Sequence, residues 1–363
     1  MRIALGIKMS GTLAAAILIL TFLLAQPAQS PAQSAPGGYK LVNNIALPQI
    51  TGWDYLTIDS EMRRLYISDN SGAVVMDIDT DRIIGRMPST PFAHEVGLVH
   101  GVALAHDLNR GFLSHEIPPS VILFNLDTLA ETGTAKTAPG TDAVVYDAFT
   151  RRVFTMNGKV KGVHNISAID ATNGASLRDI PLPGSPEFAV ADGSGHLYVN
   201  IESKSELAQV DTRTLKILHL WPLAPCEAPG AMAIDAAHRR LFIGCDNKIM
   251  AMVDADSGKV LGTVATGDGV DAARFDPATG YAFASSDEGL LTIAHEDAPR
   301  QFTLVGNVKT LPGGRTMALD TKTHRVFVLC GTGDDRTAAK TPGNPHGYPV
   351  AAPATVKLLI FGR

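Results

Sequence analysis

The chain has 363 residues, of which 45% are hydrophobic and 18% charged, and its formal net charge at pH 7 is −5. This composition is that of an ordinary globular protein, and the length is sufficient for a large core. The negative charge argues against nucleic acid or an anionic membrane as the main binding partner.

The N-terminal segment differs from the rest of the chain. Arg2 and Lys8 precede an apolar run at 13–24, which small and polar residues follow. This order is typical of a secretory signal peptide. The alternative, a permanent membrane anchor, needs about 20 apolar residues, and the run is shorter than that. We therefore expect residues 1–35 to be a signal peptide with a short linker, and the mature protein to be periplasmic or extracellular without a membrane span.

The remainder of the chain is repetitive. Seven aromatic residues recur at intervals of 41 to 46 residues: Tyr66, Phe112, Phe154, Tyr198, Phe242, Phe283 and Phe327. In five copies an aspartate precedes the aromatic residue by seven positions: Asp59, Asp147, Asp235, Asp276 and Asp320. Ala105 replaces it in the second copy, and Asp192 lies one residue closer in the fourth. This period matches that of four-stranded propeller blades.

Each copy has the pattern of four strands joined by turns. The last copy supplies only three of them, the third at 355–361, and the segment 39–47 near the other end of the chain can provide the missing strand. Such an arrangement closes a ring and leaves no open sheet edge at the seam. We expect residues 36–363 to form a monomeric, all-β, seven-bladed propeller of four-stranded blades, closed by the N-terminal strand.

One stretch carries a family resemblance. The segment LYVNIESKSELAQVDTRTLKI at 197–217 resembles the YVTN-type repeat, and residues 39–363 as a whole resemble exported, YncE-like seven-bladed propellers. Propellers of this kind serve as binding proteins, surface proteins and enzymes, so the resemblance implies the fold and leaves the function open. It also implies that the first strand of each blade lines the central tunnel and begins at the top face.

On this assignment, the residue five positions before the repeated aspartate position lies at the tunnel mouth. In the seven copies this residue is Asp54, His100, Asp142, Glu187, Gly230, Asp271 and Arg315. The pattern predicts a ligand or cation site, with Asp54, His100, Asp142, Glu187 and Asp271 as candidate ligands of a divalent cation. Carboxylates suit a hard cation, and an imidazole also permits Zn²⁺ or Cu²⁺. The alternative is a hydrated channel mouth in which these groups contact only water and one another.

A long glycine- and proline-rich segment follows Cys330 and ends near Thr355. Loops of this length inside a compact domain are usually functional or disordered. We expect it to cover part of the tunnel mouth, with His346 and Tyr348 as contacts to the ligand. Further histidines are expected on the same face: His94, His115 and His164.

The three cysteines suggest one disulfide in an exported protein. Cys226 and Cys245 fall at the same end of the fifth blade, so we expect them to be bonded to each other, and we expect Cys330 to be a buried thiol. On the opposite face, an arginine recurs two residues before the aromatic position: Arg64, Arg110, Arg152, Arg240 and Arg325. We interpret these arginines as structural, each paired with the aspartate of its own blade, rather than as a nucleic acid patch.

Catalytic motifs are scarce in this sequence. It has no Gly-x-Ser-x-Gly, no Gly-x-x-x-x-Gly-Lys and no His-Glu-x-x-His. The sequence therefore favours a non-catalytic propeller that binds a small ligand, a cation or a protein partner at the tunnel mouth. Two alternatives stay open: a metal-assisted hydrolase or lactonase that uses the same residues, and a cell-surface interaction platform. The family resemblance alone implies a third, single-stranded nucleic acid binding through the recurrent arginines, which would weaken steeply as salt rises.

Overall fold

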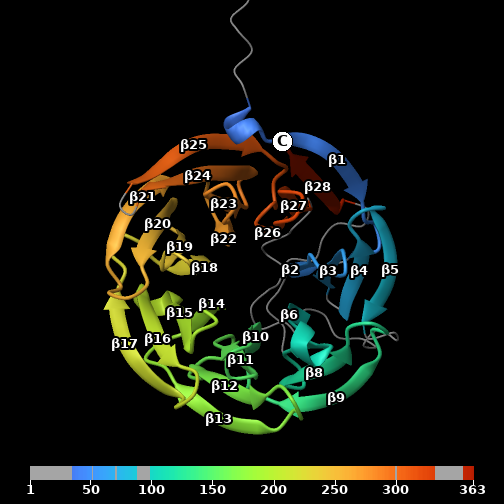
Figure 1. Ribbon diagram of the computed structural model, residues 1–363, viewed down its shortest axis with the longest axis vertical. Coiled ribbons are helices and arrows are strands. Elements are labelled where there is room, and N and C mark those ends of the chain that lie inside the picture. Colours follow the sequence, from blue (N-terminus) through green and yellow to red (C-terminus); the bar gives the residue numbers. More distant parts are fainter. Residues whose placement is uncertain (1–34, 51, 70–71, 88–98, 299–300, 332–354) are drawn as a thin grey trace, which may run out of the picture. The chain divides into compact units, whose positions relative to one another are not determined.

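The computed structural model describes residues 35–50, 52–69, 72–87, 99–298, 301–331 and 355–363. The expected signal peptide therefore lies outside the described residues. Within the described part, Ala35–Arg363 forms one compact unit of seven four-stranded antiparallel sheets arranged in a ring (Figure 1). The all-β, seven-bladed propeller predicted from the repeat is confirmed.

The strands of the first four blades follow one another in the chain. The first blade contains β2 (Trp53–Asp59), β3 (Arg64–Asp69), β4 (Gly72–Asp77) and β5 (Arg82–Met87), and the second contains β6 (Val99–Ala105), β7 (Arg110–His115), β8 (Ser120–Asn125) and β9 (Glu131–Lys136). The third blade contains β10 (Thr141–Asp147), β11 (Arg152–Asn157), β12 (Asn165–Asp170) and β13 (Ser176–Pro181), and the fourth contains β14 (Pro186–Ala191), β15 (His196–Ile201), β16 (Glu206–Asp211) and β17 (Lys216–Pro222).

The other three blades contain the remaining strands. The fifth blade contains β18 (Pro229–Asp235), β19 (Arg240–Cys245), β20 (Ile249–Asp254) and β21 (Val260–Ala265). The sixth contains β22 (Val270–Asp276), β23 (Tyr281–Ser286), β24 (Leu290–Ala298) and β25 (Gln301–Lys309). The seventh contains β26 (Thr316–Asp320), β27 (Arg325–Cys330), β28 (Lys357–Gly362) and β1 (Lys40–Ala46). Three short 3-10 turns complete the described elements: η1 (Pro36–Gly38), η2 (His106–Leu108) and η3 (Glu202–Lys204).

The N-terminal strand closes the ring. Strand β1 pairs antiparallel with β28, from Lys40 opposite Gly362 to Ala46 opposite Lys357. The first and last strands of the described chain therefore lie in one sheet, beside each other in Figure 1. Tyr39, just before β1, is fully buried and packs against Phe283 of the neighbouring blade at a ring separation of 5.2 Å.

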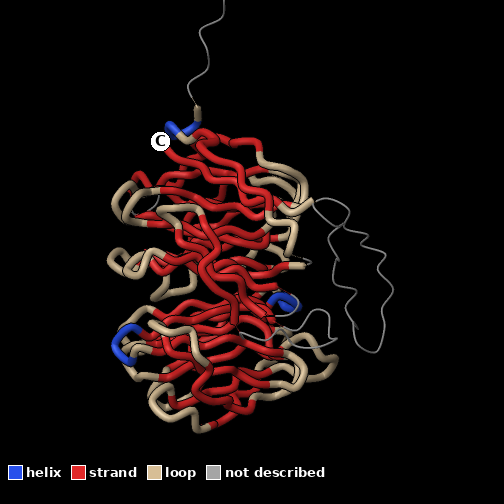
Figure 2. The backbone as a smooth tube through the Cα atoms, turned by 90° about the vertical axis from the view of Figure 1, so that its right-hand side faces the viewer, coloured by secondary structure: helices blue, strands red, loops and turns tan. Residues whose placement is uncertain are grey.

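The repeated aspartate and aromatic positions have clear structural reasons. Oδ1 of Asp59 accepts hydrogen bonds from the backbone N–H groups of Glu61 and Met62, which fixes the tight turn after the first strand. The aromatic residue lies in the second strand and is buried against a neighbouring blade, as Phe242 is against Phe275 at 4.8 Å. Strands occupy the body of the ring and the connections gather at its two faces (Figure 2).

The expected pairing of the recurrent arginines is wrong for most of them. Arg110 donates to the backbone carbonyls of Ala171 and Thr172 in the next blade, both at 2.7 Å. The arginines Arg64, Arg152 and Arg325 likewise donate to turn carbonyls of a neighbouring blade. Only Arg240, of this described set, pairs with a carboxylate of its own blade, Asp254, at 2.8 Å. The hydrogen bonds of Arg64, Arg110, Arg152 and Arg325 therefore join neighbouring blades.

Cys226 and Cys245 form a disulfide in the fifth blade, with their Cα atoms 5.5 Å apart. Cys330 is a buried free cysteine, and burial raises the pKa of its thiol to about 11. The Cys330 thiol is therefore protonated and inert at neutral pH. Among the described residues, no helix has the length and apolar composition needed to cross a bilayer.

Candidate ligand site at the tunnel mouth

The first strand of each blade lines the central axis, as Figure 1 shows for β2, β6, β10, β14, β18, β22 and β26. Each tunnel-mouth residue expected from the sequence is the second residue of its first strand, except for Arg315, which immediately precedes β26. The equivalent positions of seven blades therefore bring these side chains to one end of the axis.

A local irregularity accompanies these residues. In six blades the pairing between the first and second strands shifts register at the tunnel-mouth residue, for example between Trp53 and Leu56, around Asp54. Such bulges bend a strand and change the direction in which side chains point, and they are common beside functional sites. The spacing of the sequence repeat does not indicate the bulge.

His100 is the centre of the first group of contacts. Its Nδ1 lies 2.7 Å from Oδ2 of Asp54 and 3.3 Å from Oδ1 of Asp142, and its Nε2 lies 3.2 Å from Oε2 of Glu116. Burial alone would lower the pKa of His100, but the three carboxylates outweigh it and raise that pKa to about 10. The side chain is therefore an imidazolium at neutral pH, with both ring nitrogens donating to carboxylates.

Lys159 joins two further carboxylates. Its Nζ lies 2.9 Å from Oδ2 of Asp142 and 3.1 Å from Oε1 of Glu187. The hydroxyl of Tyr55 donates to the same oxygen of Glu187 at 3.4 Å. Lys159 comes from the connection between β11 and β12, which the repeat alignment does not mark as part of the site. The sequence did offer one signal for Lys159: connections between the second and third strands were expected on the mouth side, and Lys159 lies in such a connection.

Asp271 and Arg315 form another ion pair, between the sixth and seventh blades. The Nε atom of Arg315 lies 3.3 Å from Oδ2 of Asp271, and about a quarter of each side chain is exposed. Burial raises the pKa of Asp271, and Arg315 opposes that shift. Gly230, the remaining mouth position, has no side chain, so the fifth blade adds no side chain to the group at the mouth.

Carboxylates outnumber cations at the described part of the mouth. Six carboxylates gather there, from Asp54, Glu116, Asp142, Glu187, Glu202 and Asp271, against three cationic side chains, from His100, Lys159 and Arg315. Burial raises the pKa of Glu187 to about 7, and burial together with the nearby Glu187 raises that of Glu202 to about 7. The site can therefore take up an additional positive charge and release protons in exchange.

The structure brings together three of the five candidate metal ligands. Asp54, His100 and Asp142 each offer an atom within 4.8 Å of the others. Glu187 instead forms an ion pair with Lys159, and Asp271 forms one with Arg315. The carboxylate oxygens of Asp54 and Asp142 are suitable ligands for a cation. For His100 to be a ligand as well, it would have to lose a proton from a ring nitrogen that now faces a carboxylate.

The segment expected to cover the mouth falls largely in residues 332–354, outside the described residues. His346 and Tyr348, together with His94, lie outside the described residues. His115 is buried, and its Nδ1 lies 3.4 Å from the hydroxyl of Ser120. The described part of the mouth is thus built from the first strands, Glu116 after β7, the β11–β12 connection and η3.

Comparison with known proteins identifies the fold. No protein-family model matches the sequence. No curated protein matches it either. Among solved structures, one described as the structure of U3-55K is similar with a TM-score of 0.70 at 8% identity, over 88% of this chain and 98% of that one. The WD40 repeats of RRP9 match with a TM-score of 0.71 at 7% identity, over 89% of this chain and 97% of that one. At such identities the similarity is one of fold alone.

Proposed function

We propose that the protein is an exported, non-catalytic propeller that binds a small, positively charged ligand at the tunnel mouth. The observation that carries this proposal is the excess of carboxylates over cations at the mouth, around His100 and Lys159. Burial, together with the neighbouring carboxylates, makes ionisation costly here and raises the pKa values of Glu187 and Glu202. A cationic ligand would relieve that cost and restore the ionised carboxylates.

Binding of this kind is linked to protons. A cation near Glu187 and Glu202 favours their ionised forms, so binding at pH 7 releases protons to the buffer. We expect calorimetric titrations in buffers of different ionisation enthalpy to show this release. The protein for this test is the mature chain, purified without chelator or affinity metal and analysed first for bound elements.

The probes are CaCl₂, ZnCl₂ and putrescine, which separate a metal ion from an organic cation. We expect one of them to bind with a stoichiometry of one, and Glu187→Gln to weaken binding. Glu131→Gln is the matched control, because Glu131 is exposed at the start of the outer strand β9. The proposal fails if none of the three probes binds, or if both variants bind like the wild type.

A metal-assisted hydrolase is the second candidate, since Asp54, His100 and Asp142 can converge on one ion. In that case the ion would activate water and a neighbouring carboxylate would act as the base. One equivalent of a single metal in the native protein, together with hydrolysis of lactone or ester substrates that His100→Gln abolishes, would favour it over simple binding. A partner recovered by cross-linking, with no small cation bound, would instead favour an interaction platform.

Export and the monomeric state form part of the same proposal. Export is supported by the basic and apolar order of the first 24 residues. Edman sequencing of the protein isolated from the cell envelope or the culture medium tests export, and we expect a new N-terminus before Tyr39. Light scattering of the purified chain tests the monomeric state.

A further inference from the structure

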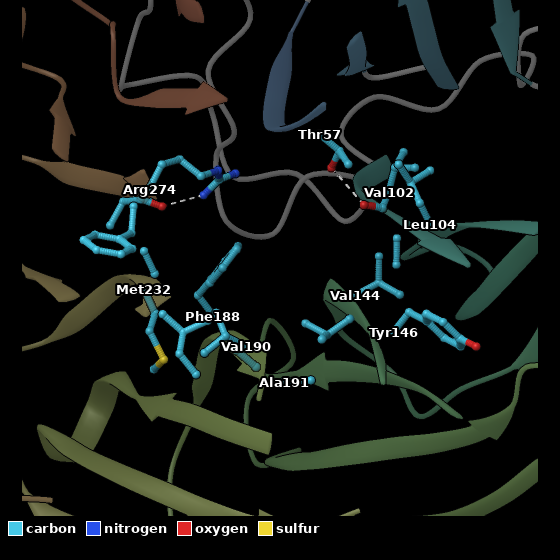
Figure 3. Close-up of a pocket in the computed structure, with 17 residues that line it drawn as sticks. Thr57, Val102, Leu104, Val144, Tyr146, Phe188, Val190, Ala191, Met232 and Arg274 are labelled. Carbon is cyan, nitrogen blue, oxygen red and sulfur yellow. Dashed lines mark hydrogen bonds between the residues drawn. The ribbon is translucent and has the colours of Figure 1, made fainter. Parts of the chain in front are cut away.

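A second compartment lies further along the same first strands. It is a largely open pocket of about 440 Å³ between β2, β6, β10, β14, β18 and β22 (Figure 3). Most of the lining is apolar, including Val102, Leu104, Val144, Phe188, Val190 and Met232. Small-molecule pockets commonly measure about 300 to 1,000 Å³ and combine apolar walls with a few placed polar groups.

Arg274 is the one charged side chain in this lining. Its guanidinium donates to the backbone carbonyls of Ala273 at 2.7 Å and Leu56 at 3.0 Å, and lies 5.8 Å from the ring centre of Phe188. Within the described part of the chain, the structure gives Arg274 no ion pair. A guanidinium has five N–H donors, so donors remain for a further acceptor. Figure 3 shows Arg274 at the edge of the cavity.

The other polar groups of the lining already have partners. The hydroxyl of Thr57 donates to the carbonyl of Val102 at 2.8 Å, and that of Tyr146 donates to Asp107 at 2.7 Å. Arg274 is therefore the strongest available determinant of what the cavity holds. Burial lowers the pKa of its guanidinium to about 10, so the group still carries its charge at pH 7.

An aromatic pair links this pocket to the carboxylate-rich mouth. The hydroxyl of Tyr55 contacts Glu187 at 3.4 Å, while its ring packs on that of Phe188 with ring centres 5.1 Å apart. Phe188 in turn lines the cavity. The tunnel therefore has an acidic compartment and an apolar compartment that carries a single cation.

We propose that the apolar compartment binds an apolar molecule with one carboxylate, which pairs with Arg274 while the hydrocarbon part packs along the tunnel wall. A cation in apolar surroundings without a carboxylate partner is costly, and a bound carboxylate compensates for it with two charge-assisted hydrogen bonds. Burial of the hydrocarbon against the walls contributes affinity but does not fix the orientation of the ligand. The mouth and the apolar compartment thus select ligands of opposite charge.

The test uses decanoate as the probe and calorimetry of the mature protein at pH 7.5. We expect decanoate to bind with a stoichiometry of one, decan-1-ol to bind more weakly, and decyltrimethylammonium not to bind. Arg274→Met keeps the volume and removes the charge, so we expect about tenfold to hundredfold weaker binding of decanoate and unchanged binding of decan-1-ol.

Two further variants keep the test decisive. Ala191→Phe adds bulk to the lining and should abolish binding of both decanoate and decan-1-ol. Arg274→Lys retains the charge but not the planar fork, so decanoate should bind between the wild type and Arg274→Met; it also replaces that variant if Arg274→Met fails to fold. Glu131→Gln, on the outer strand β9, should leave decanoate binding unchanged. Failure of decanoate to bind, or equal binding by the wild type and the Arg274 variants, would overturn the proposal.

Discussion

The ammonium of Lys159 lies 2.9 Å from Oδ2 of Asp142, whose carboxylate has no exposed surface. A connection between two strands of one blade thus supplies the cation for a carboxylate on the innermost strand of the same blade. The same ammonium contacts Glu187 in the next blade at 3.1 Å. Lys159 therefore joins two blades at the mouth, and this arrangement has consequences for stability.

Replacement of Lys159 by methionine should destabilise the protein by about 2 to 4 kcal/mol at pH 7, because it leaves Asp142 buried without one of its two cations. The effect should be smaller at pH 5, where Glu187 is protonated. Denaturant unfolding at both pH values measures it. Lys161→Met, an exposed neighbour in the same connection, is the control and should change stability by less than about 0.5 kcal/mol.

The protonation of His100 should make stability fall at alkaline pH. Its pKa is about 10 in the folded protein against an ordinary value of 6.5, so its contribution is complete below pH 6.5 and is lost as the pH rises toward 10. We expect the ¹⁵N signals of its ring to remain those of an imidazolium at pH 8. A neutral ring at pH 7 would contradict this prediction.

His100→Gln should be less stable than the wild type by about 3 to 5 kcal/mol at pH 6, because three carboxylates lose their shared cation. Between pH 6.5 and 10 the curve of unfolding free energy against pH should be flatter for this variant. His238→Gln is the matched control. His238 pairs with Asp235 in a turn and is 74% exposed, so its loss should change stability much less than the loss of His100 does.

Glu187 gives a pH dependence in a lower window. Its pKa is about 7 when folded against 4.5 ordinarily, so the folded protein binds the extra proton between these values and stability falls as the pH rises through that window. Glu187→Gln should remove this part of the decline and equal or exceed the stability of the wild type at pH 7.5. Denaturant midpoints at pH 5, 6 and 7.5 measure it. A glutamine variant with an unchanged slope would show that Glu187 is ionised throughout.

Loss of the disulfide should destabilise the fifth blade. The bond joins Cys226 and Cys245, which are 19 positions apart in the sequence, and for a loop of this length the chain-entropy relation gives about 3 kcal/mol. The double variant Cys226→Ala with Cys245→Ala should lower the unfolding free energy by about that amount. Cys330→Ala, which leaves the bond intact, is the control. Thiol titration of the denatured wild type should find one free thiol, and a count of three would contradict the pairing.

The propeller and its closure were predictable because each blade repeats the same local chemistry. Asp59 and its equivalents fix turns that depend on neighbouring backbone groups, and the aromatic position fills the space between blades; both are visible as a period in the sequence. The positions of Asp54, His100 and Asp142 near one another followed from the same period. Lys159 and Glu116 were missed because they occur once each, outside the repeat.

The sequence by itself determined what depends on local pattern: the number of blades, their strand order and the residues that begin each tunnel strand. Only the tertiary structure decided the charge states and the second compartment. The pKa values of His100 and Glu187 depend on burial and on atoms from other strands, connections and blades. Arg274 looks like any other strand residue in the sequence, and it becomes a lone cation in an apolar cavity only when the first strands converge around one axis.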